Sequence, residues 1–241
     1  MSEAAPCRRL DWDSTFFGMT IARVDSPVLD EASAGAAILW CEGQRVRCLY
    51  YLCPIDAASM RIAEGHGFHA VDVRLAFERV CSPNVAAPVE HVRPYDPVDR
   101  ESLRAIARNG FRGTRFDADP GFARRRVQDL YDVWLTQSCE GWARHVLVAV
   151  NGSVPIGFVT CHDDGDGAWR IGLIGVAEEA RGRGTGRTLV AGAVATCARE
   201  GARTLAVVTQ GHNIAAQRLY QREGFQTSAA HLWYHRWFGS R

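Results

Sequence analysis

The 241-residue sequence contains no lysine, so all 28 of its cationic side chains are arginine. This absence excludes Schiff-base chemistry on a lysine side chain. Guanidinium groups fork onto phosphate oxygens, which agrees with phosphate binding, but a GC-rich coding sequence explains the bias more simply. The net charge is only +1. The chain as a whole therefore has no electrostatic attraction for nucleic acid or for a membrane surface, and we expect neither as a partner.

The sequence also lacks the patterns of disulfide, zinc and membrane proteins. Its eight cysteines include no C-x-x-C pair, which favours free thiols in a reducing compartment. Residues 1–9 show no signal-peptide stretch, and no run approaches the roughly 20 apolar residues of a membrane span. His231 and His235 lie four residues apart, a spacing that alone is a poor metal signal. We predict a cytoplasmic protein without a metal.

Proline punctuates residues 82–88, which predicts a linker between a first domain over 1–82 and a second over 88–241. Hydrophobic periodicity predicts an α/β (α+β) second domain. The expected elements are helices over 97–109 and 120–138, strands over 145–150, 154–161 and 169–176, a helix to about 200, a strand over 204–209, a helix over 213–223 and an aromatic strand from 225. That last strand either completes the sheet or pairs across a homodimer.

The two parts share a pattern at an offset of 157 residues. Ser59-Met60-Arg61-Ile62 followed by Gly67-Phe68 matches Ala216-Gln217-Arg218-Leu219 followed by Gly224-Phe225. The flanking strands also register, which favours a true strand-helix-strand repeat over chance. The first copy has no glycine-rich loop before it, and Ala63 stands where the second copy has Tyr220. We therefore expect a single active site, in the second part.

The glycine-rich loop Arg181-Gly182-Arg183-Gly184-Thr185-Gly186 lies between a predicted strand and a predicted helix. Free N–H groups at a helix N-terminus bind pyrophosphate, and glycine allows the backbone to approach closely. The dinucleotide pattern G-x-G-x-x-G fails because Arg187 occupies the third glycine position, and no G-K-[ST] phosphate loop exists. Coenzyme A remains as the pyrophosphate ligand.

The loop resembles the R/Q-x-x-G-x-G/A signature of the GCN5-related N-acetyltransferases (GNAT), over about residues 90–238. This resemblance implies the GNAT fold, a central mixed and mostly antiparallel sheet flanked by helices, and acetyl-CoA as cosubstrate. Asn213 and Tyr220, followed by Gly224-Phe225, look like the second signature of the family. There the Asn opens a helix near the pantetheine arm and the Tyr faces the thioester sulfur.

A narrower resemblance spans nearly the whole chain. Residues 10–18, 114–116, 170–173 and 209–213 look like segments of the dTDP-fucosamine (dTDP-4-amino-4,6-dideoxygalactose) N-acetyltransferases of the WecD type. Those enzymes carry a degenerate half-GNAT domain in front of the catalytic one, as the repeat suggests here. The resemblance implies a nucleoside-diphosphate-linked amino sugar as the amine acceptor.

In this fold the strand before the loop parts from its neighbour at a bulge, and Gly172 and Gly175 are compatible with one. N–H groups near Leu173 and Ile174 would then donate to the thioester carbonyl. We expect coenzyme A to contact residues of the strand and the loop: Leu173, Ile174, Gly175, Val176, Arg181, Gly182, Arg183, Gly184, Thr185, Gly186 and Asn213. Asn213 is equally suited to capping its helix.

Tyr220 is the candidate general acid, because a phenol is protonated at pH 7 and can donate to the departing sulfur. The plain alternative is a core tyrosine. A base is harder to name, since residues 169–176 contain no carboxylate. The options are Glu178, Glu179, His162, Asp163 and His231, a water relay, or an amine that binds already neutral.

Arginines 100, 104, 108 and 112 form an i, i+4 row, which is usually a solvated helix face. The loop after this helix forms part of the acceptor site in the family, so Arg115 and Phe116 are candidate acceptor residues. Two other functions stay open: N-acetylation of another small amine or a peptide amine, and acyl-CoA binding without catalysis. The arginine-rich 100–126 segment argues against a polyamine acceptor.

Overall fold

The computed structural model describes residues 5–82 and 90–239. Residues 83–89, which make up most of the predicted linker, lie outside this described part. Backbone contacts divide the chain into two compact units. Unit 1 consists of Met1–Arg74, Gly113–Val127 and Ala230–Arg241, and unit 2 of Leu75–Arg112 and Gln128–Ala229. Unit 1 therefore takes in two segments of the predicted second domain.

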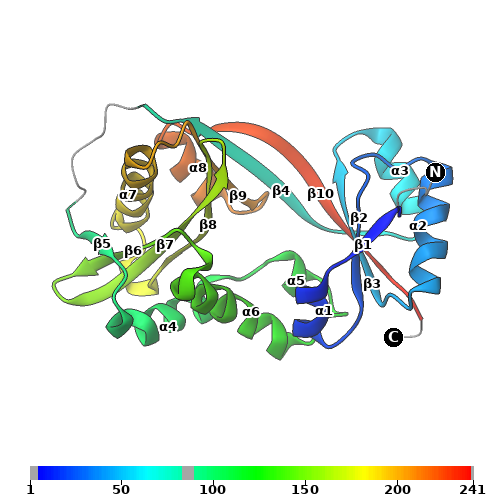
Figure 1. The fold of residues 1–241 in the computed structure, drawn as a ribbon, viewed down its shortest axis with the longest axis horizontal. Helices are drawn as coiled ribbons and strands as arrows, with labels where there is room; N and C mark the ends of the chain where they lie inside the picture. Colours follow the sequence, from blue (N-terminus) through cyan, green and yellow to red (C-terminus); the bar gives the residue numbers. More distant parts are fainter. Residues whose placement is uncertain (1–4, 83–89, 240–241) are drawn as a thin grey trace. The chain divides into compact units, whose positions relative to one another are not determined.

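Unit 1 contains a sheet with the strand order β1-β2-β3-β10. β2 and β3 are parallel, while β1 with β2 and β3 with β10 are antiparallel. Figure 1 shows these strands with the neighbouring helices α2 and α3. The elements are β1 (Cys7–Arg9), α1 (Asp11–Phe17), β2 (Ile21–Val24), α2 (Glu31–Gly43), β3 (Cys48–Pro54), α3 (Ala57–Gly65), α5 (Arg115–Ala118), and parts of β4 (His69–Val80) and β10 (Gln226–Trp237).

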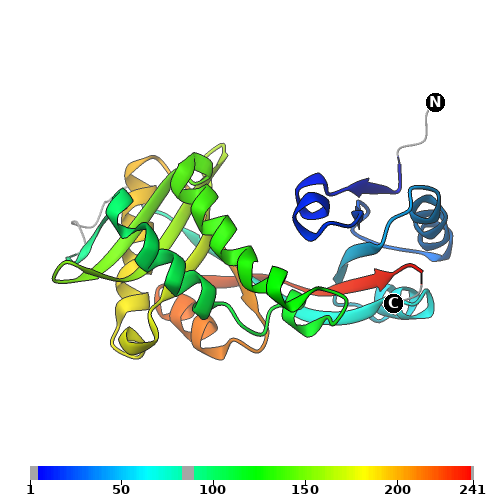
Figure 2. The same ribbon diagram turned by 90° about the horizontal axis from the view of Figure 1, so that it is seen from below.

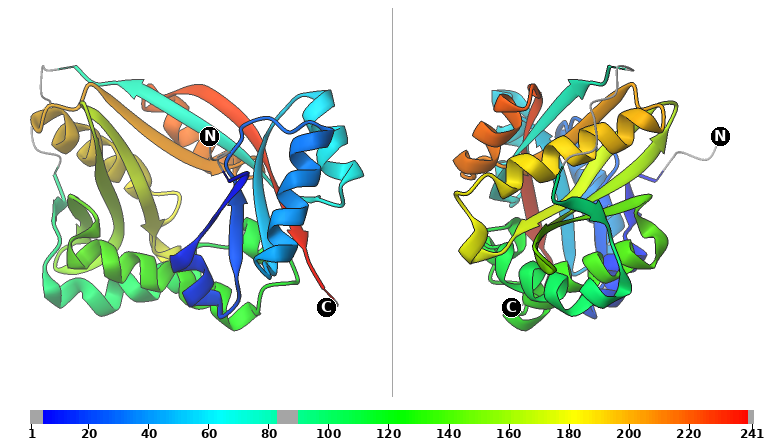
Figure 3. Two further views of the ribbon diagram at one scale, coloured as in Figure 1. Left: turned by 45° about the vertical axis from the view of Figure 1, so that its right-hand side comes forward. Right: turned by 90° about the vertical axis from the view of Figure 1, so that its left-hand side faces the viewer.

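One face of the unit 1 sheet is an apolar core. Leu49, Tyr51 and Cys53 alternate along β3 and pack with Tyr234 of β10 and the small residues of α2 and α3. Figure 3 shows both helices beside these strands. Asp30 starts α2 with a capping box, in which its side chain accepts from the Ser33 N–H. The alternate strand residues therefore belong to the other face, which carries a different set of side chains described below.

Unit 2 contains a mixed sheet. The pairs β5–β6, β6–β7 and β7–β8 are antiparallel, and β8 runs parallel to β9. The predicted hairpin at Asn151-Gly152 joins β6 to β7, and Gly152 adopts the positive φ of +60° that such a turn requires. The elements are β5 (Val92–Pro94), α4 (Arg100–Gly110), α6 (Arg124–Gln137), β6 (His145–Asn151), β7 (Val154–Gly165), β8 (Ala168–Val176), α7 (Thr185–Arg199), β9 (Thr204–Gln210), α8 (Ile214–Arg222), and the short helices η1 (Pro97–Asp99), η2 (Ser138–Trp142) and η3 (Glu178–Ala180).

Helices cover both faces of this sheet. α7 packs against β6, β7 and β8, and its Leu189, Val190 and Ala193 belong to the main core of unit 2. α4 packs against β7 and β8 from the other face (Figure 2). The predicted helices and strands are confirmed with boundary shifts of a few residues, except that the helix expected over 120–138 begins at Arg124. The aromatic strand pairs within the chain, where His231–Trp237 run antiparallel to β3.

The repeated segments have matching elements. α3 (57–65) and β4 (69–80) shift by 157 residues onto α8 (214–222) and β10 (226–237). Gly67 and Gly224 end the two helices with φ of +74° and +80°. Arg79 on β4 donates to the Glu223 carbonyl at the end of α8, and the matching Arg236 on β10 lies over Gly67 after α3. Each arginine therefore serves the helix of the other copy, which agrees with a repeat.

Candidate functional site

A fork between β8 and β9 forms a cleft in unit 2. The parallel pairing of these strands ends at Ile171 and Val207, and beyond these residues β8 remains paired with β7 but not with β9 within the described chain. The cleft has a volume of about 590 Å³. It is lined by β8 residues 171–176, the glycine loop, β9 residues 207–210 and α8, with Phe111, Tyr131 and Trp134 on a further side. The predicted coenzyme-binding residues lie around it, except Arg183.

The predicted bulge lies at the mouth of this fork. Between the pairs Val159–Ile174 and Cys161–Ile171, β7 has one residue, Thr160, whereas β8 has two. The extra residue belongs to Gly172-Leu173, which turns β8 away from β9. Gly175 has another role, since it pairs in register with Phe158 and a Cβ there would lie 2.7 Å from the Phe158 ring.

A buried hydrogen-bond chain supports the bulge. The Leu173 N–H donates to Oγ1 of Thr160 at 2.9 Å, and the same hydroxyl lies 3.3 Å from Nε2 of His162. Burial and Arg170 lower the pKa of His162, so its imidazole is neutral at pH 7. A Cβ on Gly172 would lie 2.4 Å from Nε2 of His162. The Leu173 N–H is therefore engaged inside the protein, and Ile174 is left as the candidate donor to the thioester carbonyl.

The glycine loop has the geometry of an anion site. Gly182 and Gly184 adopt φ of +73° and +89°, and no atom lies within 4 Å of the Cβ position at either residue. Gly184 precedes α7, whose first turn has no side-chain cap, so its N–H groups are available to an anion together with the helix dipole. Gly186 instead permits close helix packing, because a Cβ there would lie 3.2 Å from Leu219.

The two loop arginines and Thr185 differ in position. Arg181 is exposed and donates to the Val176 carbonyl at 3.2 Å, which brings its guanidinium to the end of β8. Arg183 is exposed and lines a neighbouring hollow with Glu179 and Thr188. Thr185 is buried, and its hydroxyl donates to the Ala180 carbonyl. Arg181 therefore lies at the cleft, Arg183 faces the neighbouring hollow, and Thr185 fixes the loop.

Tyr220 lies on α8 with its ring in the core. The ring packs against Phe77 and Phe225, and only 2% of the residue is exposed. Burial raises the pKa of the phenol, so it is protonated at physiological pH. No side-chain hydrogen bond to this hydroxyl occurs within residues 5–82 and 90–239, and the residue lines the cleft. Tyr220 is thus a core residue whose position also allows proton donation into the cleft.

Asn213 caps α8, because its side-chain oxygen accepts from the Ala216 N–H at 3.1 Å. This confirms the capping role that the sequence allowed. The residue also lines the cleft beside Gln210. Its amide NH₂ is not used by the cap, so a contact with coenzyme A remains compatible with the geometry.

The candidate bases fall in different places. Glu178 and Glu179 are exposed on η3, and Asp163 is exposed near the end of β7. His162 is buried next to Gly172, as described above, and His231 belongs to unit 1. No carboxylate occurs on β8 itself.

The arginine row on α4 is only partly a solvated face. Arg104 and Arg108 both bind the carboxylate of Asp132 on α6, with shortest distances of 2.7 and 2.6 Å. Burial alone would raise the pKa of Asp132, but the hydrogen bonds from these arginines outweigh it and hold the pKa below its usual value. The two cations therefore join α4 to α6. Sequence periodicity gave no sign of Asp132.

Arg115 and Phe116 belong to unit 1, where they open α5. Phe116 is buried against Phe17 and Phe122. Arg115 is half-buried, and its guanidinium carbon lies 4.2 Å from the ring centre of Tyr50. It also contacts Nε2 of His235 at 3.0 Å, while Nδ1 of His235 bonds the buried carboxylate of Asp119 at 2.7 Å. This linked set was not expected from the sequence.

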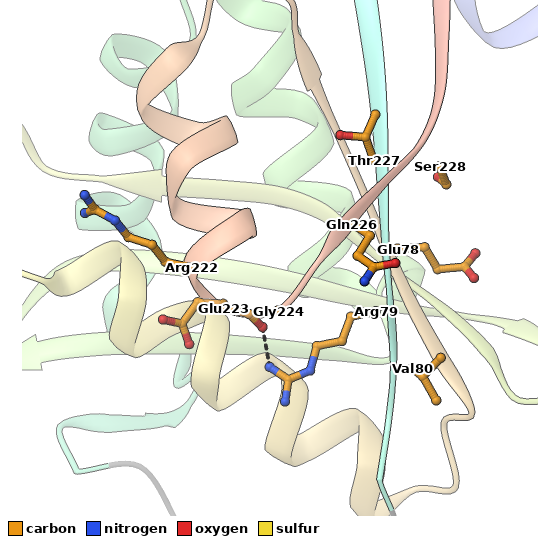
Figure 4. Close-up of a pocket in the computed structure, with 9 residues that line it drawn as sticks. All are labelled: Glu78, Arg79, Val80, Arg222, Glu223, Gly224, Gln226, Thr227 and Ser228. Carbon is orange, nitrogen blue, oxygen red and sulfur yellow. Dashed lines mark hydrogen bonds between the residues drawn. The ribbon is translucent and has the colours of Figure 1, made fainter.

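Unit 2 carries a second surface hollow, at the C-terminal end of α8 (Figure 4). It is lined by Glu78, Arg79, Val80, Arg222, Glu223, Gly224, Gln226, Thr227 and Ser228. Arg79 reaches across it to the carbonyl of Glu223, whose carboxylate also bonds Arg187. Arg79 and Glu223 thus have partners within the protein, and Arg79 bonds a carbonyl at the end of α8. We therefore assign the hollow a structural role.

Three further observations bear on the site chemistry. All eight cysteines are free thiols. Within the described residues, no group of three His, Cys, Asp or Glu side chains is arranged to hold a metal ion. None of the helices in the described part is long and apolar enough to cross a membrane.

Comparison with known proteins shows a family resemblance. The profile of the acetyltransferase (GNAT) family matches residues 111–225, which include the bulge, the glycine loop and Tyr220. This segment is therefore similar to the GNAT acetyltransferases, a family that uses acetyl-CoA.

Two curated relatives are more specific. The chain is 26% identical to the dTDP-fucosamine acetyltransferase of Escherichia coli O6:H1, over 98% of this chain and 100% of that protein. It is 28% identical over 152 residues to the spore coat polysaccharide biosynthesis protein SpsD of Bacillus subtilis (strain 168). That alignment covers 63% of this chain and 52% of the relative, so the chain spans about half of SpsD.

Solved structures show the same fold. A GCN5-related N-acetyltransferase from Sphaerobacter thermophilus superposes with a TM-score of 0.69 at 17% identity, covering 96% of this chain and 76% of that one. A tandem GNAT protein from the clavulanic acid biosynthesis pathway superposes with a TM-score of 0.62 at 15% identity, covering 92% of this chain and 76% of its own. At these identities the likeness concerns the fold alone.

Proposed function

We propose that this protein transfers the acetyl group of acetyl-CoA to the primary amine of a nucleoside-diphosphate-linked amino sugar, by direct attack in a ternary complex. The observation that carries the proposal is the end-to-end similarity to a dTDP-fucosamine acetyltransferase, over 98% of this chain. The similarity to a polysaccharide biosynthesis protein supports the same class of acceptor. A similarity confined to the GNAT domain would have left the acceptor open.

Unit 2 supplies the groups for acetyl-CoA. In the proposal, the N-terminal turn of α7 and the backbone of Gly182 and Gly184 bind the pyrophosphate, and Arg181 and Arg183 add charge-assisted hydrogen bonds. The β8 segment 173–176 and Asn213 line the path of the pantetheine arm. The open space at both glycines supports this fit, because phosphate oxygens need the volume that a Cβ would take.

Acetyl-CoA supplies an activated thioester. During transfer, negative charge develops first on the carbonyl oxygen and then on the departing sulfur, and the protein must stabilise both. In the proposal the Ile174 N–H donates to the carbonyl oxygen as negative charge develops there; one such donor typically lowers a barrier by about 3 kcal/mol. Tyr220 gives its phenolic proton to the departing sulfur. Burial raises the pKa of this phenol, so the group is protonated when the thiolate forms, and the same shift makes it a weaker acid.

The amine must lose a proton, and no protein base is assigned. β8 carries no carboxylate, Glu178 and Glu179 are exposed, and Nε2 of His162 is already in contact with the Thr160 hydroxyl. We therefore propose that the amine reacts in its neutral form or releases its proton to water. The acceptor itself is assigned to unit 1, where Arg115 and Phe116 lie.

Measuring thiol release from acetyl-CoA against a panel of dTDP- and UDP-linked amino sugars, free amino sugars, amino acids and peptides tests the proposal. We expect turnover with one or more nucleotide-linked amino sugars and little with the free sugars. Turnover with other small amines but not with nucleotide sugars would replace the proposed acceptor with the broader alternative. Tight coenzyme binding without turnover on any amine would indicate an acyl-CoA-binding module without catalysis.

A further inference from the structure

The face of the unit 1 sheet opposite to α2 and α3 carries polar and aromatic side chains in register. Arg23 on β2 is paired with Tyr50 on β3, and Tyr50 with His235 on β10. Trp233 and His231 follow at alternate positions on β10 and therefore lie on the same face. α1 and α5 cover part of this face through Phe17 and Phe116, whose rings are 5.4 Å apart.

Two guanidinium groups are gathered on one indole of this face. The guanidinium carbon of Arg115 lies 4.2 Å from the ring centre of Trp233, and that of Arg23 lies 5.5 Å from the same centre. Arg115 is held further by the rings of Tyr50 and Phe116, each at 4.2 Å. Such cation–π contacts fix the direction of a guanidinium without neutralising its charge. Its remaining N–H groups stay available for an anion.

A third arginine extends this positive charge. Arg74 on β4 and Arg23 are each at least half-buried, and both act electrostatically on His231. Burial, together with repulsion from neighbouring arginines, lowers the pKa of both guanidinium groups, although they stay charged at any physiological pH. We call Arg23, Arg74 and Arg115 the arginine cluster.

The arginine cluster makes no direct ion pair. Within residues 5–82 and 90–239, none of its three members lies within 4 Å of a carboxylate oxygen. Asp13 and Asp25 attract Arg115 and Arg23 from a longer distance, while Asp25 pairs directly with Arg8 at 3.1 Å and Asp119 bonds His235. Half-buried cations without a direct ion pair are costly, because burial removes water that is only partly replaced.

Two buried polar atoms on the same face also lack partners. The hydroxyl of Tyr50, a residue with 0% exposure, and Nδ1 of His231 make no hydrogen bond within the described chain. An unsatisfied buried polar group is unfavourable, and native proteins contain few of them. Burial raises the pKa of Tyr50, so its hydroxyl keeps a proton to donate. Cations without a direct ion pair and unused hydrogen-bonding groups on one face favour the same ligand, an anion rich in acceptor oxygens.

We propose that the arginine cluster is the binding site for the diphosphate of the acceptor substrate. Three guanidinium groups match the charge and the many oxygens of a nucleoside diphosphate better than a single carboxylate, and arginine binds phosphate oxygens in pairs. The identity of the ligand as a nucleoside diphosphate rests on the proposed function. The site itself rests on the charges and unpartnered atoms of unit 1.

Binding of dTDP and UDP to the full chain by isothermal titration calorimetry tests this site, with thymidine and inorganic pyrophosphate as probes of the two halves of the ligand. We expect dTDP and pyrophosphate to compete, and thymidine alone to bind at least tenfold more weakly than dTDP. Arg23→Gln and Arg74→Gln should each weaken dTDP at least tenfold, since each removes a charge-assisted contact. The dissociation constant of acetyl-CoA should change less than twofold.

Arg61→Gln is the matched control, because Arg61 is an exposed arginine on α3; it should leave dTDP affinity unchanged. Thermal unfolding separates binding from folding. Removing one cation from an unbalanced set should leave the melting temperature unchanged or raise it, whereas loss of a purely structural arginine would lower it. Unchanged dTDP affinity in both Gln variants, or lower affinity only alongside a lower melting temperature, would overturn the site.

The outcome is distinguishable from failure of the proposed function. Arginine-dependent dTDP binding without acetylation of any nucleotide amino sugar would retain the site and remove the proposed reaction. Acetylation of a nucleotide amino sugar with an unchanged KM in Arg23→Gln and Arg74→Gln would retain the reaction and remove the site.

Discussion

The backbone N–H of Leu173 donates a 2.9 Å hydrogen bond to the side-chain oxygen of Thr160, across the bulge that opens the cleft. Thr160 is 0% exposed and also contacts Nε2 of His162. The bond uses an N–H that the extra residue in β8 would otherwise leave unpaired in the core. A threonine on β7 thus stabilises the irregular stretch of β8 that precedes Ile174, the proposed donor to the thioester carbonyl.

Thr160→Val should therefore weaken both folding and catalysis. Valine fills the same volume but cannot accept the Leu173 N–H, and an unsatisfied buried donor costs about 1–3 kcal/mol. We expect this loss in the free energy of urea unfolding, together with a lower kcat as the bulge loosens. Thr196→Val is the control, because its hydroxyl bonds only the exposed side chain of Arg199. An unchanged unfolding free energy in Thr160→Val would contradict this role.

Gly182→Ala and Gly184→Ala should each raise the dissociation constant of coenzyme A at least tenfold. Their positive φ values strain any other residue, and a Cβ would enter the space proposed for phosphate oxygens. Gly201→Ala is the control. Gly201 lies just after the other end of α7 with a φ of +87°, so alanine there is strained as much as in the loop variants. All three variants should lose about 1 kcal/mol of stability. Equal coenzyme affinity in the loop variants and the control would exclude the loop from binding.

Tyr220→Phe should lower kcat by roughly 10² to 10³-fold, as expected for the loss of a general acid. The KM for acetyl-CoA should change little, because the ring and its packing on Phe77 and Phe225 are retained. Tyr234→Phe is the control: its hydroxyl bonds Glu64 in unit 1. Full kcat in Tyr220→Phe under steady-state assay would leave Tyr220 as a core residue only.

Acidification should destabilise the protein between about pH 6.5 and pH 4. Burial lowers the pKa of His235 to about 4, whereas a histidine in the unfolded chain titrates near 6.5. In this window the unfolded chain binds a proton that the folded chain does not, so the free energy of unfolding falls as the pH falls. The loss attributable to His235 is about 3 kcal/mol.

Urea unfolding of His235→Gln at pH 7 and pH 4.5 measures this contribution. The variant should be less stable than the parent at pH 7, because Asp119 loses its partner, but its stability should fall less on acidification. Some dependence remains, since the pKa values of His162 and His231 are also lowered. His212→Gln, at an exposed position, is the control. An identical pH dependence in His235→Gln and the parent would contradict the buried neutral histidine.

The residues that the sequence assigned to coenzyme A, Arg183 excepted, line one cleft of unit 2, and they could be found because their patterns are local. Glycines at a strand-to-helix turn, an Asn at a helix start and a Gly-Phe after a helix each leave a pattern within a few residues. Gly182, Gly184 and Asn213 therefore lie where the sequence indicated. The bulge was also foreseen, from Gly172, although the occupant of the space above that glycine, His162, was not.

The ion pairs of Asp132 and the arginine cluster could not be predicted from the sequence, because both depend on contacts between distant segments. Asp132 joins α4 to α6 from 24 and 28 residues away in sequence, and nothing in its own helix pattern marks it as a partner of arginine. The arginine cluster draws on β2, β4 and α5, whose residues are spread between positions 23 and 115 and meet only in the folded unit. Such a site has no sequence spacing by which to recognise it.

The central claim is acetylation of a nucleotide-linked amino sugar at the unit 2 cleft. The most direct measurement is coenzyme A release from acetyl-CoA with dTDP- and UDP-amino sugars, with the product's new amide identified by mass spectrometry. We expect a gain of one acetyl group on the sugar amine, with turnover strongly reduced in Tyr220→Phe. Coenzyme binding without acetyl transfer to any nucleotide-linked amino sugar would contradict it.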